Sequence, residues 1–120
     1  DAHGALAPWS NHGPAVALGA PGAAILTTAR GGGYAVVEGT SVAAAIVGGA
    51  AALRIAQDPA AAPSDVARRL VERSAPAPAA AGAPPTPGLV DADAATDPAP
   101  AARLPGDWRK PRLYLPTVRR

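Results

Sequence analysis

The sequence predicts a chain that contains both strands and helices, because short β-favouring segments come first and longer helical segments follow them. Glycine is concentrated before residue 57, beside β-branched residues, which is typical of strands and tight turns. Proline is concentrated after residue 58, where it indicates loops and extended linkers. Alanine dominates the apolar residues, and Phe, Met and Cys are absent, so an independent core would hold few large side chains.

The first half of the chain contains turn, strand and helix signals in a clear order. Turn residues occupy positions 10–14, and a short apolar strand is expected at 16–18. Two β-favouring runs at 25–28 and 34–38 flank three consecutive glycines, which predicts a hairpin. Ser41 then opens a helical run to about residue 56. Because that run is almost wholly apolar, we expect a buried helix, with Gly48 and Gly49 packed closely against a neighbour.

The second half predicts one amphipathic helix and little other regular structure. This helix is expected from Ser64, as the N-cap, to about residue 73, with Val66, Leu70 and Val71 on its buried face. Residues 75–87 are expected to form a loop, and residues 89–95 a last short helix. Residues 97–120 contain five prolines and are expected to be extended.

Charge and hydropathy argue against two classes of partner. The formal net charge is +2, and the basic residues gather in residues 101–120. Such a tail can contact nucleic acid, but no stacking aromatics interleave with its charges, so a solvated tail and no nucleic-acid partner are expected. The longest apolar run, residues 42–53, has twelve residues. A bilayer needs about 20, so no membrane span is expected.

The clearest chemical signal is Gly39-Thr40-Ser41 at the start of the apolar helix. A serine there lies beside the unpaired N–H groups and the positive end of the helix, and its own N–H can donate to an oxyanion. Gly39 has no side chain and lets a substrate backbone approach. The alternative is that Ser41 is an ordinary N-cap residue, which is common for serine.

Residues 39–53, Gly-Thr-Ser-Val-Ala-Ala-Ala-Ile-Val-Gly-Gly-Ala-Ala-Ala-Leu, resemble the nucleophile segment of the subtilisin-like serine proteases. That segment usually reads Gly-Thr-Ser-Met-Ala-x-Pro-His-Val-Ala-Gly. Ordered matches to the family extend from about residue 5 to residue 96. Three positions depart from the family pattern, with Val42, Ala45 and Ile46 in place of Met, Pro and His. None of the three removes the nucleophile.

The resemblance implies a three-layer α/β fold with a mostly parallel sheet, of which residues 1–96 form the C-terminal part and residues 97–120 a Pro/Arg-rich tail or linker. It also implies a serine endopeptidase that acts on polypeptides through an acyl-enzyme on Ser41, with Gly39 and Thr40 lining the primary specificity region. No cofactor is required, and no metal site is expected because no acidic cluster has calcium-loop spacing. Secretion or a cell-envelope location is implied by the family alone.

The other triad members are expected outside these residues. The family order is Asp, His, Ser, which Asp1, His3 or His12, and Ser41 imitate. Both histidines fall where the family has surface residues, so we expect the base and its orienting acid in an upstream part of the same catalytic domain. Asn11 is likewise expected to be a turn residue and not the family's oxyanion donor. The absence of Met indicates a processed or truncated chain. The alternatives are a catalytically inactive subtilisin-like module used for binding or assembly, and a low-complexity protein with a chance match.

Overall fold

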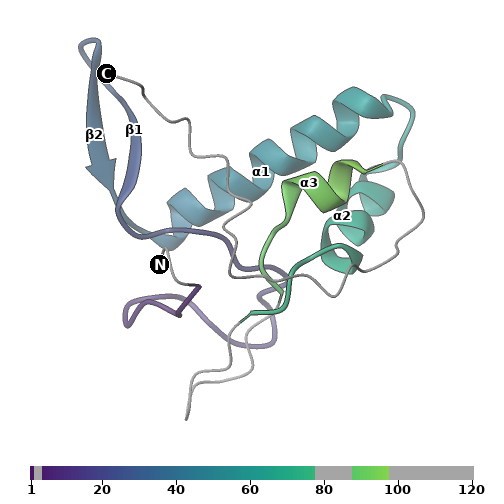
Figure 1. Cartoon of the computed structure of the whole chain (residues 1–120), viewed down its shortest axis with the longest axis horizontal. Coiled ribbons are helices and arrows are strands. Elements are labelled where there is room, and N and C mark those ends of the chain that lie inside the picture. Colours follow the sequence, from purple (N-terminus) through teal and green to yellow (C-terminus); the bar gives the residue numbers. More distant parts are fainter. Residues whose placement is uncertain (2–3, 78–87, 98–120) are drawn as a thin grey trace.

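A computed structural model describes residues 1, 4–77 and 88–97 of the chain. Figure 1 shows a hairpin that projects away from a group of helices. The elements of the described residues are β1 (Ile25–Ala29), β2 (Gly33–Val37), α1 (Thr40–Gln57), α2 (Pro63–Glu72) and α3 (Ala92–Thr96). Residues 78–87 of the predicted loop and residues 98–120 of the predicted tail lie outside the described residues.

The predicted hairpin is confirmed. β1 and β2 pair antiparallel, with Ile25 opposite Val37 and Ala29 opposite Gly33, and the glycines at 31–33 turn the chain between them. Along β1, half-buried and exposed residues alternate, as expected for a ribbon with one face toward the molecule. The hairpin leads directly to α1, because only two residues separate the end of β2 from the first residue of the helix.

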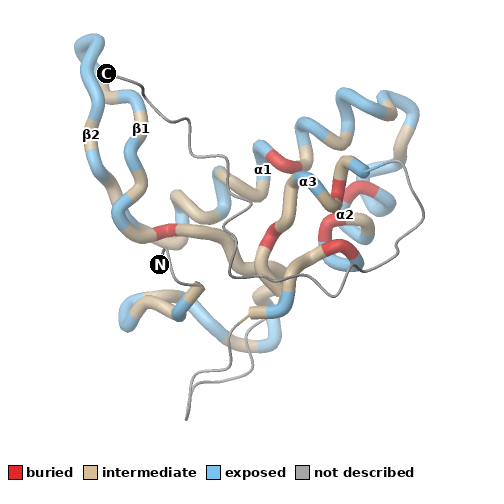
Figure 2. Tube along the Cα trace, in the orientation of Figure 1, coloured by how far each residue is buried: buried red, intermediate tan, exposed pale blue. Residues whose placement is uncertain are grey.

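The helix α1 is confirmed at nearly the predicted bounds, but its predicted burial is wrong for the described residues. Of its eighteen residues only Ala50 is buried, while Leu53 is 56% exposed and Ile55 is 48% exposed. A Cβ atom built on Gly48 or Gly49 would meet nothing within 4 Å, so the expected close packing is also missing there. The reason is that α2 and α3 are the elements that make most of the contacts with α1 among the described residues, and both lie along the same part of it (Figure 2).

The length of α1 also bears on the membrane prediction. The helix has eighteen residues, because residues 40–41 and 54–57 flank the apolar run. It is long and apolar enough to cross a membrane by length and composition alone. Buried helices of soluble proteins satisfy the same criterion. The expectation of no membrane span therefore stays a prediction.

The helix α2 is confirmed, with two corrections. Its first residue is Pro63 and its N-cap is Ala62, which makes no side-chain cap, so the N-cap prediction for Ser64 is wrong. Proline suits the first helical position because its φ is fixed and it has no N–H to leave unpaired. Val66 and Leu70 are buried as predicted, whereas Val71 is 45% exposed.

The short helix α3 begins three residues later than predicted. Asp91 caps it by accepting the N–H of Ala94 at 2.9 Å, and Leu89 is held in β-bridges before it. Leu89 pairs parallel with Gly19 and antiparallel with Ala75. The predicted strand at 16–18 does not form. The next residue, Gly19, makes the parallel bridge with Leu89.

The described core is small and lies where the three helices meet. Its five buried apolar residues come from α1, α2, α3 and the segment before α3 (Figure 2): Ala50, Val66, Leu70, Val90 and Ala95. The described chain thus combines helices and strands, as the α/β prediction requires. The three-layer arrangement and the mostly parallel sheet stay predictions, since the sheet described here is an antiparallel hairpin.

Candidate active site at the start of α1

Ser41 is the second residue of α1, and its side chain is exposed. The N-cap is Gly39, and no side chain caps the helix, so the interpretation of Ser41 as an N-cap residue is wrong. Within the described part of the chain, no hydrogen bond engages the Ser41 hydroxyl. The hydroxyl is therefore accessible and is not used to hold the helix.

The first turn of α1 offers N–H donors to an incoming group. The Gly39 carbonyl accepts the N–H groups of Val42 at 3.1 Å and Ala43 at 3.3 Å. The N–H groups of Thr40 and Ser41 come earlier and have no carbonyl partner within the helix. This turn also contains no acidic residue. The helix end thus carries a partial positive charge that no neighbouring carboxylate in the turn offsets.

Two glycines keep the backbone around Ser41 free of side chains. Gly39 has a φ of 145°, which L side chains rarely adopt, and a Cβ atom there would lie 3.2 Å from Ser41 Oγ. The Gly39 N–H donates to the carbonyl of Gly22 at 2.8 Å, and a Cβ atom on Gly22 would lie 2.8 Å from the Gly39 oxygen. Both positions therefore require glycine, one for its conformation and one for the close approach of two backbone segments.

Asn11 also reaches the start of α1, which the sequence did not predict. Its Nδ2 donates to Thr40 Oγ1 at 3.1 Å, across 29 positions of sequence. The surrounding turn was predicted, but its contact with the helix was not, because nothing in the local sequence pattern reports how a turn packs. The side chains of Asn11 and Thr40 thus meet beside the candidate nucleophile.

The structure brings no histidine to Ser41 among the described residues. His12 is exposed, as expected, and its Nδ1 lies 3.1 Å from the carbonyl of Ser10. The Asp1 carboxylate accepts the N–H of Ala5 at 2.9 Å, within its own terminal segment. His3 lies outside the described residues. Asp1 and His12 follow the triad order in sequence, but the hydrogen bonds described here join neither of them to Ser41.

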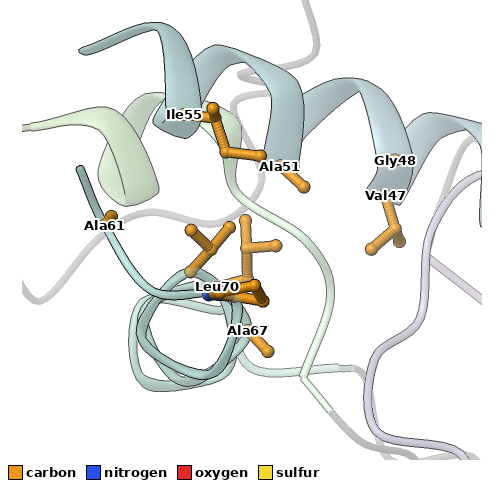
Figure 3. Close-up of a pocket in the computed structure, with 9 residues that line it drawn as sticks. Val47, Gly48, Ala51, Ile55, Ala61, Ala67 and Leu70 are labelled. Carbon is orange, nitrogen blue, oxygen red and sulfur yellow. The ribbon is translucent and has the colours of Figure 1, made fainter. Parts of the chain in front are cut away.

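An apolar groove lies farther along α1, on the side toward α2 (Figure 3), and Ser41 is not among its lining residues. It has a volume of about 410 Å³ and carries no titratable side chain. Its lining residues come from α1, α2 and the connection between them: Val47, Gly48, Ala51, Ile55, Ala61, Pro63, Val66, Ala67 and Leu70. No side chain that lines this groove can donate, accept or transfer a proton, so it is not a second reaction centre.

Metal-ligating side chains do not gather in threes anywhere in residues 4–77 or 88–97. The chemistry available at Ser41 is that of an accessible hydroxyl beside helical N–H donors, which suits nucleophilic attack on a carbonyl and stabilisation of the resulting oxyanion. This chemistry uses no cofactor. The expectation that no metal or cofactor takes part stays a prediction.

Comparisons with known proteins identify the family. A comparison with curated proteins finds no match to this chain. A sequence model described as the subtilase family matches residues 1–102, which include the turn around Asn11, the hairpin and all three helices. The match covers most of the chain, and Ser41 with its flanking residues lies inside it. The chain belongs to the subtilase family, a family of serine peptidases.

Proposed function

We propose that this protein is a serine endopeptidase whose nucleophile is Ser41. The observation that carries the proposal is the exposed, uncapped hydroxyl of Ser41 in the first turn of α1, within a chain of the subtilase family. A serine with a capping or packing role would use its hydroxyl in a hydrogen bond to the helix. Here the hydroxyl is left available on the side where the helix presents free N–H groups.

In the proposed reaction, Ser41 Oγ attacks the carbonyl carbon of a peptide bond while a histidine takes its proton. The negative charge that develops on the carbonyl oxygen is stabilised by the Ser41 N–H, with the helix end adding a favourable potential. The histidine then protonates the departing amine, which leaves an acyl-enzyme on Ser41. Water, activated by the same histidine, releases the acyl group and restores the hydroxyl.

Gly39 and Thr40 are proposed to line the primary specificity region. Gly39 presents bare backbone next to Ser41 Oγ, because a Cβ atom there would lie 3.2 Å from that oxygen. An extended substrate segment needs such an approach, since its own backbone must come within hydrogen-bond reach of the site. Thr40 follows Gly39 and is half-buried, so its side chain forms part of the wall beside the scissile bond.

We assign the base and its orienting acid to an upstream part of the same catalytic domain. The same part is proposed to cover the exposed apolar face of α1, where Leu53 and Ile55 lie open among the described residues. A helix that is apolar on all sides is typical of a protein interior, so its open face fits a further packing partner. Secretion or a cell-envelope location belongs to the same proposal and rests on family resemblance.

The test is proteolysis by the intact protein with and without the Ser41 hydroxyl. Ser41→Ala is expected to lower kcat/KM for a peptide substrate by at least about 10³-fold, because a triad acts as a unit and its nucleophile cannot be replaced by water alone. The matched control is Ser64→Ala, since Ser64 is the exposed second residue of α2 as Ser41 is of α1. It should leave kcat/KM unchanged.

Undiminished cleavage by the Ser41→Ala protein would reject the proposed nucleophile. An intact, folded protein without cleavage of any peptide and without reaction at Ser41 would favour the inactive module used for binding or assembly. Loss of cleavage in both serine variants would indicate a general effect of removing surface hydroxyls and would also count against Ser41.

A further inference from the structure

Two long-range hydrogen bonds fix the start of α1, and they differ in what they require of the sequence. One joins the Gly39 N–H to the Gly22 carbonyl at 2.8 Å and uses backbone atoms alone. The other runs from Asn11 Nδ2 to Thr40 Oγ1 at 3.1 Å and depends on two particular side chains. Only the second is lost on substitution of a side chain.

The turn that carries Asn11 is braced by its own hydrogen bonds. Ser10 Oγ donates to the Asn11 carbonyl at 3.1 Å, and the Val16 N–H donates to the Gly13 carbonyl at 3.0 Å. The ring of His12 also contacts the Ser10 carbonyl at 3.1 Å. A turn held in this way can present the Asn11 amide at a fixed place, so the contact with Thr40 is backed by local structure.

The polarity of this hydrogen bond determines what Thr40 can still do. A side-chain amide nitrogen only donates, so Thr40 Oγ1 is the acceptor and keeps its own proton for another partner. The bond also restrains the rotation of the Thr40 side chain in the first turn of α1. Because Ser41 is the next residue, a shift of Thr40 moves both the Ser41 hydroxyl and the Ser41 N–H.

We propose that Asn11 is a positioning residue of this peptidase: through Thr40 it holds the first turn of α1, and with it Ser41, in the geometry needed for attack. The inference rests on the proposed function of Ser41. Asn11 touches Thr40 and no reacting atom, so its effect belongs to the chemical step more than to substrate binding. A misplacement of about 1 Å in an active site lowers rates by as much as about 10²-fold.

The experiment measures kcat and KM of the intact protein with a peptide substrate, the rate at which a fluorophosphonate labels Ser41, and the thermal midpoint. Asn11→Ala is expected to lower kcat and the labelling rate by about 10-fold or more, with KM within about 2-fold of the parent value. The control is Ser64→Ala, which removes an exposed polar side chain at the start of α2 instead of α1. It should leave kcat and the labelling rate unchanged.

Two further variants separate positioning from folding. Asn11→Asp preserves the shape of the side chain, but a carboxylate only accepts, so it reverses the bond and consumes the Thr40 proton. Because the reversed bond still holds Thr40, this variant should keep the thermal midpoint and lose less kcat than Asn11→Ala. In a Thr40→Val background, Asn11→Ala should cause no additional loss, because the acceptor of the bond is already gone.

The inference is overturned if Asn11→Ala retains the parent kcat, if Asn11→Asp loses as much kcat as Asn11→Ala, or if Asn11→Ala causes its full loss in the Thr40→Val background. It is also overturned if KM rises while kcat is kept, since Asn11 would then act on substrate binding. Ser41→Ala in the same assay distinguishes the two proposals. Cleavage that survives Ser41→Ala rejects the proposed function, whereas a dead Ser41→Ala protein beside a fully active Asn11→Ala protein rejects this inference alone.

Discussion

The helices α1 and α2 start in opposite ways and are exposed in opposite ways. At its start α2 has Pro63, which removes one unpaired N–H, and Asp65, which offsets the positive helix end. The first turn of α1 has neither a side-chain cap nor an acid, and its free donors surround Ser41. Along its length α2 buries Val66 and Leu70 and keeps its charges outside, whereas α1 is apolar on all sides with only Ala50 buried.

The difference fits the proposal that α2 has its packing partners within the described residues and that α1 has a further partner outside them. The polar and apolar faces of α2 already match what surrounds them, as expected for an outer helix. The exposed face of α1 is as apolar as its packed face, and its start keeps unused donors. Both features fit an inner helix whose open end takes part in chemistry. Substitutions on the two helices should therefore respond differently in the intact protein.

The largest effect on stability is expected from leucine truncation, and it compares the two helices directly. Leu70→Ala in α2 removes a side chain that is 4% exposed and should destabilise the protein by about 2–5 kcal/mol. Leu53→Ala in α1 removes a side chain that is 56% exposed among the described residues. If the upstream part of the domain covers α1, Leu53→Ala should cost about as much as a buried leucine, which urea unfolding of the intact protein measures.

The comparison breaks if the two leucines keep the order of their exposure in the described residues. A cost below about 0.5 kcal/mol for Leu53→Ala, with a full cost for Leu70→Ala, is the behaviour of a surface position. It would mean that α1 is exposed in the intact protein and that its apolar face has another role.

A smaller effect is expected from filling the space beside Gly48. A Cβ atom built there meets nothing within 4 Å among the described residues. If the proposed cover also fills the groove that Gly48 lines, Gly48→Leu should destabilise the intact protein by about 1–3 kcal/mol through overpacking. Gly48→Ala is the control, since it adds one methyl group and gains up to about 1 kcal/mol of helix propensity. A higher thermal midpoint for both variants would show an open helix face.

The smallest effect is expected on the outer face of α2. Arg68 donates to Asp65 at 2.9 Å and to Glu72 at 3.3 Å, and these contacts raise the pKa of its guanidinium above the ordinary value. All three side chains are more than half exposed, so solvent screens the attraction. Arg68→Ala should leave the thermal midpoint of the intact protein nearly unchanged. A loss as large as that of Leu70→Ala would show that α2 is not an outer helix.

The parts of the fold that local chemistry determines were predictable from the sequence. Three glycines between β-favouring runs predicted the hairpin, and a long apolar run predicted α1 almost to its ends. The errors in the predicted helix starts arose where two neighbouring residues each favour a helix start. Pro63 is the first residue of α2, so Ser64 lies inside the helix and is not its N-cap. Similarly, α3 begins later than predicted because Leu89 is held in β-bridges.

For the candidate site, the motif predicted that Ser41, Gly39 and Thr40 lie together. In the structure Gly39 is the N-cap of α1, and Thr40 and Ser41 are its first two residues. The contact of Asn11 with Thr40 could not be predicted, because it joins residues 29 apart through the packing of a turn on a helix. The requirement for glycine at position 22 could not be predicted either, since it depends on how closely the backbone there passes Gly39. Such requirements arise from tertiary approach and leave no periodic or local pattern in the sequence.

The most direct test of the account is to locate the reactive residue chemically. The intact protein is treated with a fluorophosphonate, digested, and analysed by mass spectrometry for the modified peptide. We predict one adduct, on Ser41, that disappears when the protein is unfolded before treatment, because an activated serine needs its folded surroundings. An adduct on another residue, or active proteolysis with Ser41 unmodified and the probe without effect, would contradict the account.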